Sequence, residues 1–89
     1  MNLVITVVGQ DQVGIVARVS SILADHKGNI IDLSQRVMTG GLFTMIMQIN
    51  LLEPEQFTAL EKAMGGLEGE LNLKIMVQRE DVFRFMHRI

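Results

Sequence analysis

The sequence predicts an α+β fold: a four-stranded antiparallel sheet with two helices on one face, followed by a short C-terminal helix. Three observations predict it. Apolar and β-branched residues gather in strand-like runs at 1–8, 29–38, 42–52 and 71–77. Between these runs, 13–27 and 54–67 space their apolar residues as helices do. The short glycine-containing connection at 39–41 predicts that the second and third strands form a hairpin.

The first strand and the first helix are joined by a turn with a glycine at each end. Residues 1–8 are mostly Val, Ile and Thr, which suits a central strand. Asp11 is predicted to cap the following helix with its side chain. Gly28 is predicted to end that helix as the left-handed residue beyond its last turn.

The pattern of the two hairpin strands predicts their register. A three-residue loop pairs Val37 with Phe43 and, in steps of two, Ile31 with Ile49, which makes one face nearly all apolar. A two-residue loop leaves both faces half polar. The first register is favoured because a slip by one residue exchanges the faces. We therefore expect helices to cover one face of the sheet and the other face to be largely polar.

The rest of the chain predicts a second helix, a fourth strand and a tail. Pro54 suits the start of the helix, and alternation from Leu71 to Val77 predicts the strand. The tail, 80–89, has helical spacing but is too short to be helical alone, so it has to dock on the rest. The order β-α-β-β-α-β with right-handed crossovers gives a ferredoxin-like sandwich. The expected division is a domain at 1–78 and a C-terminal helical tail at 79–89.

Composition narrows the possible functions. The 89 residues fit one domain, and 48% apolar content with 20% charge favours self-association. No run approaches the roughly 20 apolar residues of a membrane span. The lack of cysteine fits the cytoplasm and excludes disulfides. Net charge −2, with four Phe and no Tyr or Trp, argues against nucleic-acid binding. Neither a cofactor nor a metal site is expected, since the two histidines lie far apart in the sequence.

The motifs Gly9-x-Asp11-x-x-Gly14-Ile15-Val16-Ala17 and Gly28-Asn29-Ile30, in this order of elements, resemble the ACT domain family. The resemblance covers essentially the whole chain apart from the tail. The chain resembles free-standing ACT proteins, and it is also similar to the ACT modules of glycine-cleavage regulators and of formyltetrahydrofolate deformylases. The resemblance implies a regulatory module and not an enzyme: a homodimer or larger homo-oligomer that binds an amino acid and acts on a metabolic enzyme or regulator.

The resemblance also implies where the ligand binds. In the family, the loop after the first strand of one subunit meets the start of the second strand of another. The matching positions here are Gly9, Gln10, Asp11, Gln12, Val13, Gly14 and Ile15 in the loop, and Asn29, Ile30 and Ile31 in the strand. Serine-binding members offer a histidine and an asparagine where this chain has Gly9 and Asp11. An aspartate repels a carboxylate and attracts an ammonium group, so serine is not implied as the ligand.

The residues themselves allow amino-acid binding, and they also have purely structural interpretations. Backbone N–H groups of Val13, Gly14 and Ile15 are candidate donors to a carboxylate at the helix start. Asp11 or the Asn29 carbonyl is the candidate acceptor for an ammonium group. Alternatively, Asp11 only caps the helix, Gly14 only allows tight packing on the sheet, and Asn29 only ends a turn.

Three function classes therefore remain: a ligand-binding regulatory module, a structural dimerisation domain without a ligand, and an enzyme of the same fold. The enzyme class, exemplified by acyl-phosphate hydrolases, requires an arginine in the first loop, and 10–14 contains none.

Overall fold

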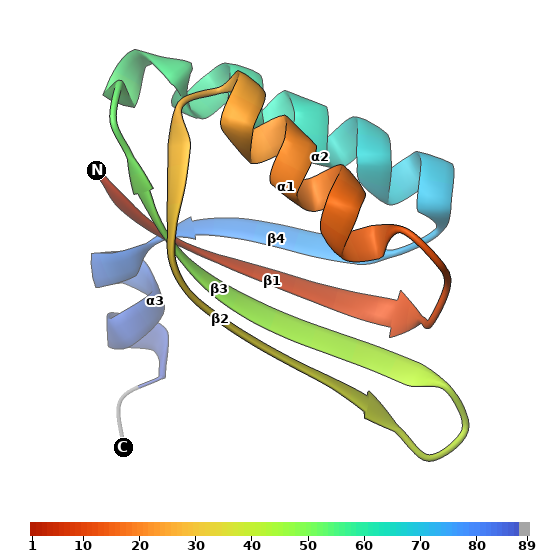
Figure 1. Cartoon of the computed structure of the whole chain (residues 1–89). Helices are drawn as coiled ribbons and strands as arrows, with labels where there is room; N and C mark the ends of the chain where they lie inside the picture. Colours follow the sequence, from red (N-terminus) through yellow and green to blue (C-terminus); the bar gives the residue numbers. More distant parts are fainter. Residues whose placement is uncertain (88–89) are drawn as a thin grey trace.

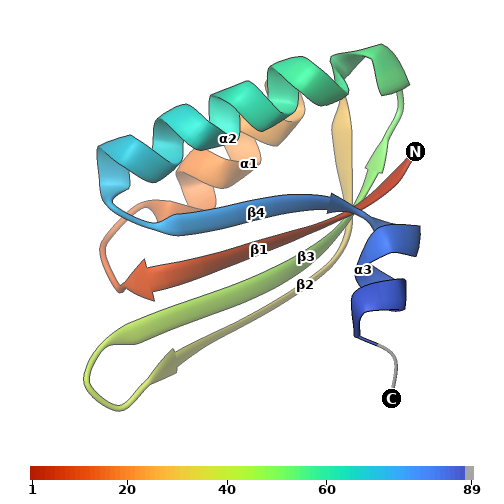
Figure 2. The ribbon, with the colours of Figure 1, turned by 180° about the vertical axis from the view of Figure 1, so that it is seen from behind.

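The computed structural model describes residues 1–87 and contains one antiparallel sheet in the strand order β2-β3-β1-β4. The elements in chain order are β1 (Asn2–Gln10), α1 (Ile15–Asp25), β2 (Gly28–Met38), β3 (Leu42–Leu51), the 3-10 turn η1 (Pro54–Gln56), α2 (Phe57–Leu71), β4 (Lys74–Arg79) and α3 (Glu80–Met86). Helices α1 and α2 cover one face of the sheet, and α3 lies on the other side (Figures 1 and 2). The predicted ferredoxin-like α+β fold is confirmed, with β1 in the interior of the sheet. No helix within residues 1–87 is long and apolar enough to cross a membrane.

The core lies between the sheet and the two long helices. Alternate residues of β1 and β3 point into it, while α1 and α2 each contribute one apolar stripe. Its fully buried members include Ile5, Val7, Val19, Leu23, Met45, Met47, Leu60 and Met64. The alternation that predicted the inner face of β3 is therefore confirmed.

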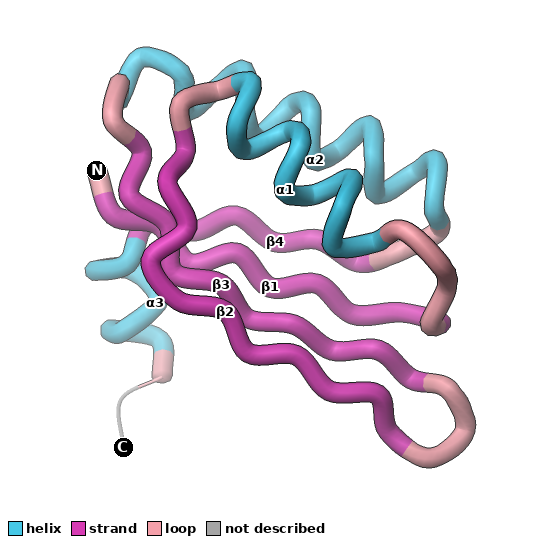
Figure 3. The backbone as a smooth tube through the Cα atoms, in the orientation of Figure 1, coloured by secondary structure: helices cyan, strands magenta, loops and turns pink. Residues whose placement is uncertain are grey.

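The hairpin has the predicted three-residue loop and register, with one correction. Val37 pairs with Phe43, and the register continues to Asp32 opposite Gln48. Beyond that point Ile30, and not Ile31, pairs with Ile49, because a bulge inserts one extra residue into β2. The prediction that helices cover the inner face of β2 is also only partly right. Strand β2 lies at the edge of the sheet (Figure 3), and most of its residues are exposed.

Both predicted ends of α1 need correction. Asp11 does not cap the helix, because the N-cap is Gly14 with φ 93° and no side chain caps the first turn. The left-handed residue after the helix is Lys27 (φ 63°), and Gly28 begins β2. A Cβ on Gly28 would lie 3.0 Å from Leu23 Cδ2, so the glycine serves close packing of β2 against α1.

The boundary between α2 and β4 also differs from the prediction. Leu71 ends α2, left-handed Asn72 (φ 55°) follows, and β4 begins at Lys74. Ile75 and Val77 do lie in the strand that their alternation predicted, but Leu71 belongs to the helix. The tail does fold as a helix, α3; Ile89, the last residue of its predicted apolar spacing, lies outside the described residues.

Candidate functional site

The loop between β1 and α1 is held on two sides. The Asp11 backbone N–H donates to the Gly41 carbonyl (2.8 Å), which ties the loop to the β2–β3 hairpin. On the other side, Gln12 Nε2 donates to the Leu71 carbonyl (3.0 Å) at the end of α2. The loop therefore has a fixed position although most of its surface is exposed.

The first turn of α1 is open at its amino end. The first backbone bond across the Gly14 cap runs from the Arg18 N–H to the Gly14 carbonyl (2.9 Å). Within the described chain, the N–H groups of Ile15, Val16 and Ala17 have no hydrogen-bond partner, as expected for the first turn of an uncapped helix. Nothing lies within 4 Å of the position that a Cβ on Gly14 would occupy. The suggestion that Gly14 serves tight helix packing is therefore wrong. The reason for glycine here is its positive φ, and the space beside it is open.

A hollow of about 490 Å³ lies beside the loop. One wall comes from the loop and the first turn of α1, and the other from the end of β2. The lining residues are Asp11, Gln12, Gly14, Ile15, Val16, Ala17, Gln35, Arg36, Val37 and Phe43. It thus combines an apolar surface with groups of opposite charge, the Asp11 carboxylate and the Arg36 guanidinium. Such a set offers donors to a carboxylate and an acceptor to an ammonium group.

The structure brings together four of the predicted site residues: Asp11, Gln12, Gly14 and Ile15 line the hollow. The side-chain amide of Gln12 is engaged by Leu71, so this residue positions the loop. Val13 is fully exposed.

Two further loop positions have structural roles. Gly9 lies in β1, where a Cβ would meet Leu73 Cδ2 at 2.6 Å. The Gln10 side chain lies over Gly41 of the hairpin turn, at 2.6 Å from the position of a Cβ there.

The predicted strand residues lie at the other end of the sheet. Asn50 of β3 pairs with Asn29 on one side and with Asn2 on the other, so β2 begins level with the start of β1, one strand away. The loop lies at the end of β1, roughly 26 Å away at about 3.3 Å per residue. Asn29, Ile30 and Ile31 therefore do not reach the loop of their own chain.

Sequence reasoning missed the residues at the end of β2. Gln35, Arg36 and Val37 form one wall of the hollow, with Phe43 beside them. A signal was available, because the predicted register already placed Val37 opposite Phe43. The missing step was the strand order: Phe43 also pairs with Gly9, which puts the end of β2 next to the loop.

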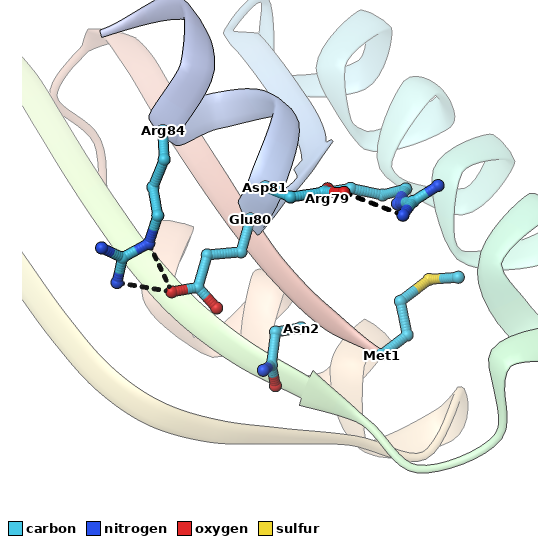
Figure 4. Close-up of a pocket in the computed structure, with 6 residues that line it drawn as sticks. All are labelled: Met1, Asn2, Arg79, Glu80, Asp81 and Arg84. Atoms are coloured by element: carbon cyan, nitrogen blue, oxygen red, sulfur yellow. Dashed lines mark hydrogen bonds and ion pairs between the residues drawn. The ribbon is translucent and has the colours of Figure 1, made fainter. Parts of the chain in front are cut away.

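A second hollow, of about 460 Å³, lies between α3 and the N-terminus (Figure 4). Its charges are satisfied within the chain: Arg84 pairs with Glu80 at 2.7 Å and Arg79 with Asp81 at 2.9 Å. The Met1 amino group donates to the Leu51 carbonyl. This hollow is therefore less suited to a charged ligand. Within residues 1–87, no three His, Asp or Glu side chains are grouped closely enough to hold a metal ion.

An ion pair joins the two long helices near the loop. Arg18 of α1 donates to Glu70 of α2 (2.9 Å), and a second nitrogen–oxygen pair is 2.7 Å apart. The hydrogen bond from Arg18, and then its charge, lower the pKa of the Glu70 carboxyl. The same hydrogen bond, and then the charge of Glu70, raise the pKa of the Arg18 guanidinium. The Gln12–Leu71 bond thus ties the loop to the end of α2, and the Arg18–Glu70 pair links α1 to the same end of α2.

Comparison with known proteins identifies the family. The ACT domain model matches residues 1–78. The UPF0237 protein of Methanosarcina acetivorans is 47% identical over 87 residues, which cover 97% of this chain and 94% of that protein. Among solved structures, an ACT domain protein from Streptococcus pneumoniae has a TM-score of 0.80 and 40% identity, covering 93% of each chain. A "putative glycine cleavage system transcriptional repressor" has a TM-score of 0.76 and 33% identity, over 86% of this chain and 44% of that one. The chain belongs to the ACT domain family.

Proposed function

We propose that the protein is a regulatory module that binds an amino acid or a related small carboxylate between two copies of the chain. The observation that carries this proposal is the open first turn of α1, which faces a hollow walled by an unpaired edge strand. The name of the 33% identical neighbour, a regulator of the glycine cleavage system, supports a regulatory role in amino-acid metabolism. A metabolic enzyme or another regulator in the cytoplasm is the proposed target, and the module itself performs no catalysis.

Pairing of two β2 edges would complete the site. Two-fold symmetry requires the paired strands to run antiparallel, so the end of one β2 meets the start of the other. Asn29, Ile30 and Ile31 of a second copy would then lie beside Gln35–Val37, next to the loop. This arrangement brings together the two segments that a single chain keeps at opposite ends of the sheet.

The polar groups of the hollow suit a zwitterion. The free N–H groups of Ile15 and Val16 and the positive end of the helix dipole favour a carboxylate, which Arg36 also attracts. The Asp11 carboxylate and the Asn29 carbonyl of the second copy offer acceptors to the ammonium group. The apolar surface of Val37 and Phe43 remains for the ligand side chain.

Thermal unfolding in the presence of each common amino acid tests this proposal. A ligand at 100 times its Kd adds about 2.7 kcal/mol to the free energy of unfolding. Asp11→Asn is expected to remove most of that gain, because the ammonium group loses its charged acceptor. Asp25→Asn, the same change at the exposed far end of α1, is the matched control and should keep it.

The outcome also separates the two main function classes. If a sample with dimer mass gains no stability from any amino acid, the structural dimerisation domain without a ligand is the better interpretation. If both Asp variants respond equally to the ligand, binding does not depend on this loop.

A further inference from the structure

The sheet has two edges, and they are not equally open. Strand β2 forms one edge with eleven residues, and β4 forms the other with six. Within residues 1–87, Ile75 of β4 and Val82 of α3 are the residues whose backbone N–H bonds to a side chain, so β2 has no such bond. The free N–H and C=O groups of an edge strand are a template for another strand. The two edges therefore offer different surfaces to a second copy of the chain.

One residue of α2, Glu68, occupies the start of the β4 edge. Its Oε2 accepts a hydrogen bond from the Ile75 N–H at 2.7 Å, and this bond is partly buried. Its backbone carbonyl accepts a second bond, from the Leu73 N–H, at 3.0 Å. No cation pairs with the Glu68 carboxylate within the described part of the chain. The partner of this carboxylate is therefore the backbone of the edge strand.

The bond to Glu68 also shows which backbone groups of β4 point outward. In an antiparallel sheet, the N–H groups of alternate residues of a strand point to the same side. Because the Ile75 N–H reaches a residue of α2, it points away from β1, and the N–H groups of Val77 and Arg79 follow it on that side. Helix α3 then begins at Glu80. Two outward N–H groups of β4, those of Val77 and Arg79, are thus left for pairing with another strand.

A sheet with two open edges would assemble without limit. Each neighbouring pair in the order β2-β3-β1-β4 is antiparallel, so β2 and β4 run in opposite directions. The β2 of one copy would therefore pair with the β4 of the next as one continuous antiparallel sheet. Two copies joined through their β2 edges would likewise present β4 at both outer ends. Either contact adds strands without closing the assembly.

We propose that Glu68 closes the β4 edge to strand pairing and so restricts edge-to-edge assembly of this chain to the β2 edge. A second copy that paired with β4 has to displace the carboxylate from the Ile75 N–H. That bond is charge-assisted, and such bonds are stronger than the neutral backbone bond that would replace it. The shortness of β4 and the lysine at its start, Lys74, act in the same direction, because both features protect sheet edges.

This role of Glu68 is separate from the candidate ligand site. Glu68 does not line the hollow beside the β1–α1 loop. The closed edge requires no ligand, so its failure would leave the proposal for amino-acid binding untouched. Conversely, a protein that binds no amino acid would still have its β4 edge closed by Glu68.

The first test is the mass of the full-length protein over a range of concentrations, measured by sedimentation. Glu68→Ala frees the Ile75 N–H, and we expect the average mass to reach roughly twice the wild-type value or more and to rise with concentration. Glu68→Gln retains an acceptor oxygen and should keep the wild-type mass. Glu61→Ala, the same change at an exposed site of α2, is the matched control and should also keep it. Circular dichroism confirms that the variants are folded.

The second test needs no variant, because it measures amide hydrogen exchange in the wild-type protein by NMR. The bond to Glu68 should slow the exchange of the Ile75 N–H by about tenfold or more relative to that of Val77, which points to the same side of β4. Equal exchange rates at the two residues would overturn the proposal. So would a folded Glu68→Ala variant with the wild-type mass at every concentration.

Discussion

Gly9 and Gly14, on either side of the β1–α1 turn, are needed for different physical reasons. Gly14 has φ 93°, a conformation that costs other residues roughly 1–2 kcal/mol, and the space beside it is open. At Gly9 a Cβ would lie 2.6 Å from Leu73 Cδ2 and 3.3 Å from the Leu73 backbone. One glycine therefore shapes the candidate site, and the other allows β1 to pass close to the start of β4.

Gly9→Ala is expected to destabilise the protein by about 1–3 kcal/mol, the usual cost of overpacking. The control is the same substitution in α2, Gly66→Ala, where a Cβ meets nothing within 4 Å. It should stabilise by about 0.4–1 kcal/mol, because alanine restricts the unfolded chain without strain. Urea unfolding measures both. A stabilising Gly9→Ala would show that Leu73 moves aside freely and that Gly9 is not there for packing.

At this scale, sequence reasoning predicted which residues form the loop but not all of their roles. Asp11 is a good capping residue by type, and nothing in the sequence shows that Gly14 adopts a positive φ and delays the helix until Ile15. The Gln12 side chain bonds to Leu71, 59 positions away in the sequence, so its role depends on tertiary structure. Arg36 was missed as a site residue for the same reason.

Among the elements, those whose apolar residues follow one clear spacing, either helical or alternating, were predicted well. All inner-face positions of β3 are apolar, whereas its outer face is polar apart from Leu42 and Ile46, so the inner face and most of the hairpin register were predictable. Leu71 fits both the helical spacing of α2 and the alternation of β4, and the left-handed Asn72 decides between them. The bulge at Ile31 could not be predicted, because it depends on how β2 follows the curvature of the sheet.

The Arg18–Glu70 pair predicts how the contact between α1 and α2 depends on pH. The pKa of Glu70 is lowered in the folded state by the hydrogen bond and charge of Arg18. Its stabilising contribution is therefore full above the ordinary glutamate pKa of about 4.3 and is lost as the pH falls through the lowered value. Because both groups are exposed, the effect should be small and weakened by salt.

The experiment compares unfolding free energies of wild type and Glu70→Gln between pH 7 and pH 2.5. Their difference is expected to shrink as the acid limit is approached. Glu61→Gln, on an exposed site of the same helix, is the control and should show no such convergence. A constant difference for Glu70→Gln would mean that the ion pair does not form in solution.

For the molecule as a whole, composition predicted an apolar surplus but not its location. Much of the surplus lies on the β2 edge, where Ile30, Ile31, Val37 and Met38 are exposed, and on the outer side of the sheet and α3, where Ile46, Met76, Val82 and Phe85 are exposed. Their positions follow from β2 lying at the edge of the sheet and α3 on its outer side. Both facts depend on the strand order and on where the tail docks.

Pairing through the β2 edge can be tested with a single charge. Ile31→Lys adds a charge to the β2 edge, where Ile31 is 58% exposed, and lysine is a residue that blocks edge pairing. We expect this variant to have half the mass of the wild-type assembly and to lose amino-acid-dependent stabilisation, since the edge pairing completes the candidate site. Phe85→Asp changes an exposed apolar residue (72%) of α3, away from this edge, and is the control that should keep both. Sedimentation and thermal unfolding on the three proteins measure both quantities. Retained stabilisation in a monomeric Ile31→Lys variant would place the whole ligand site within one chain and contradict the shared-site arrangement.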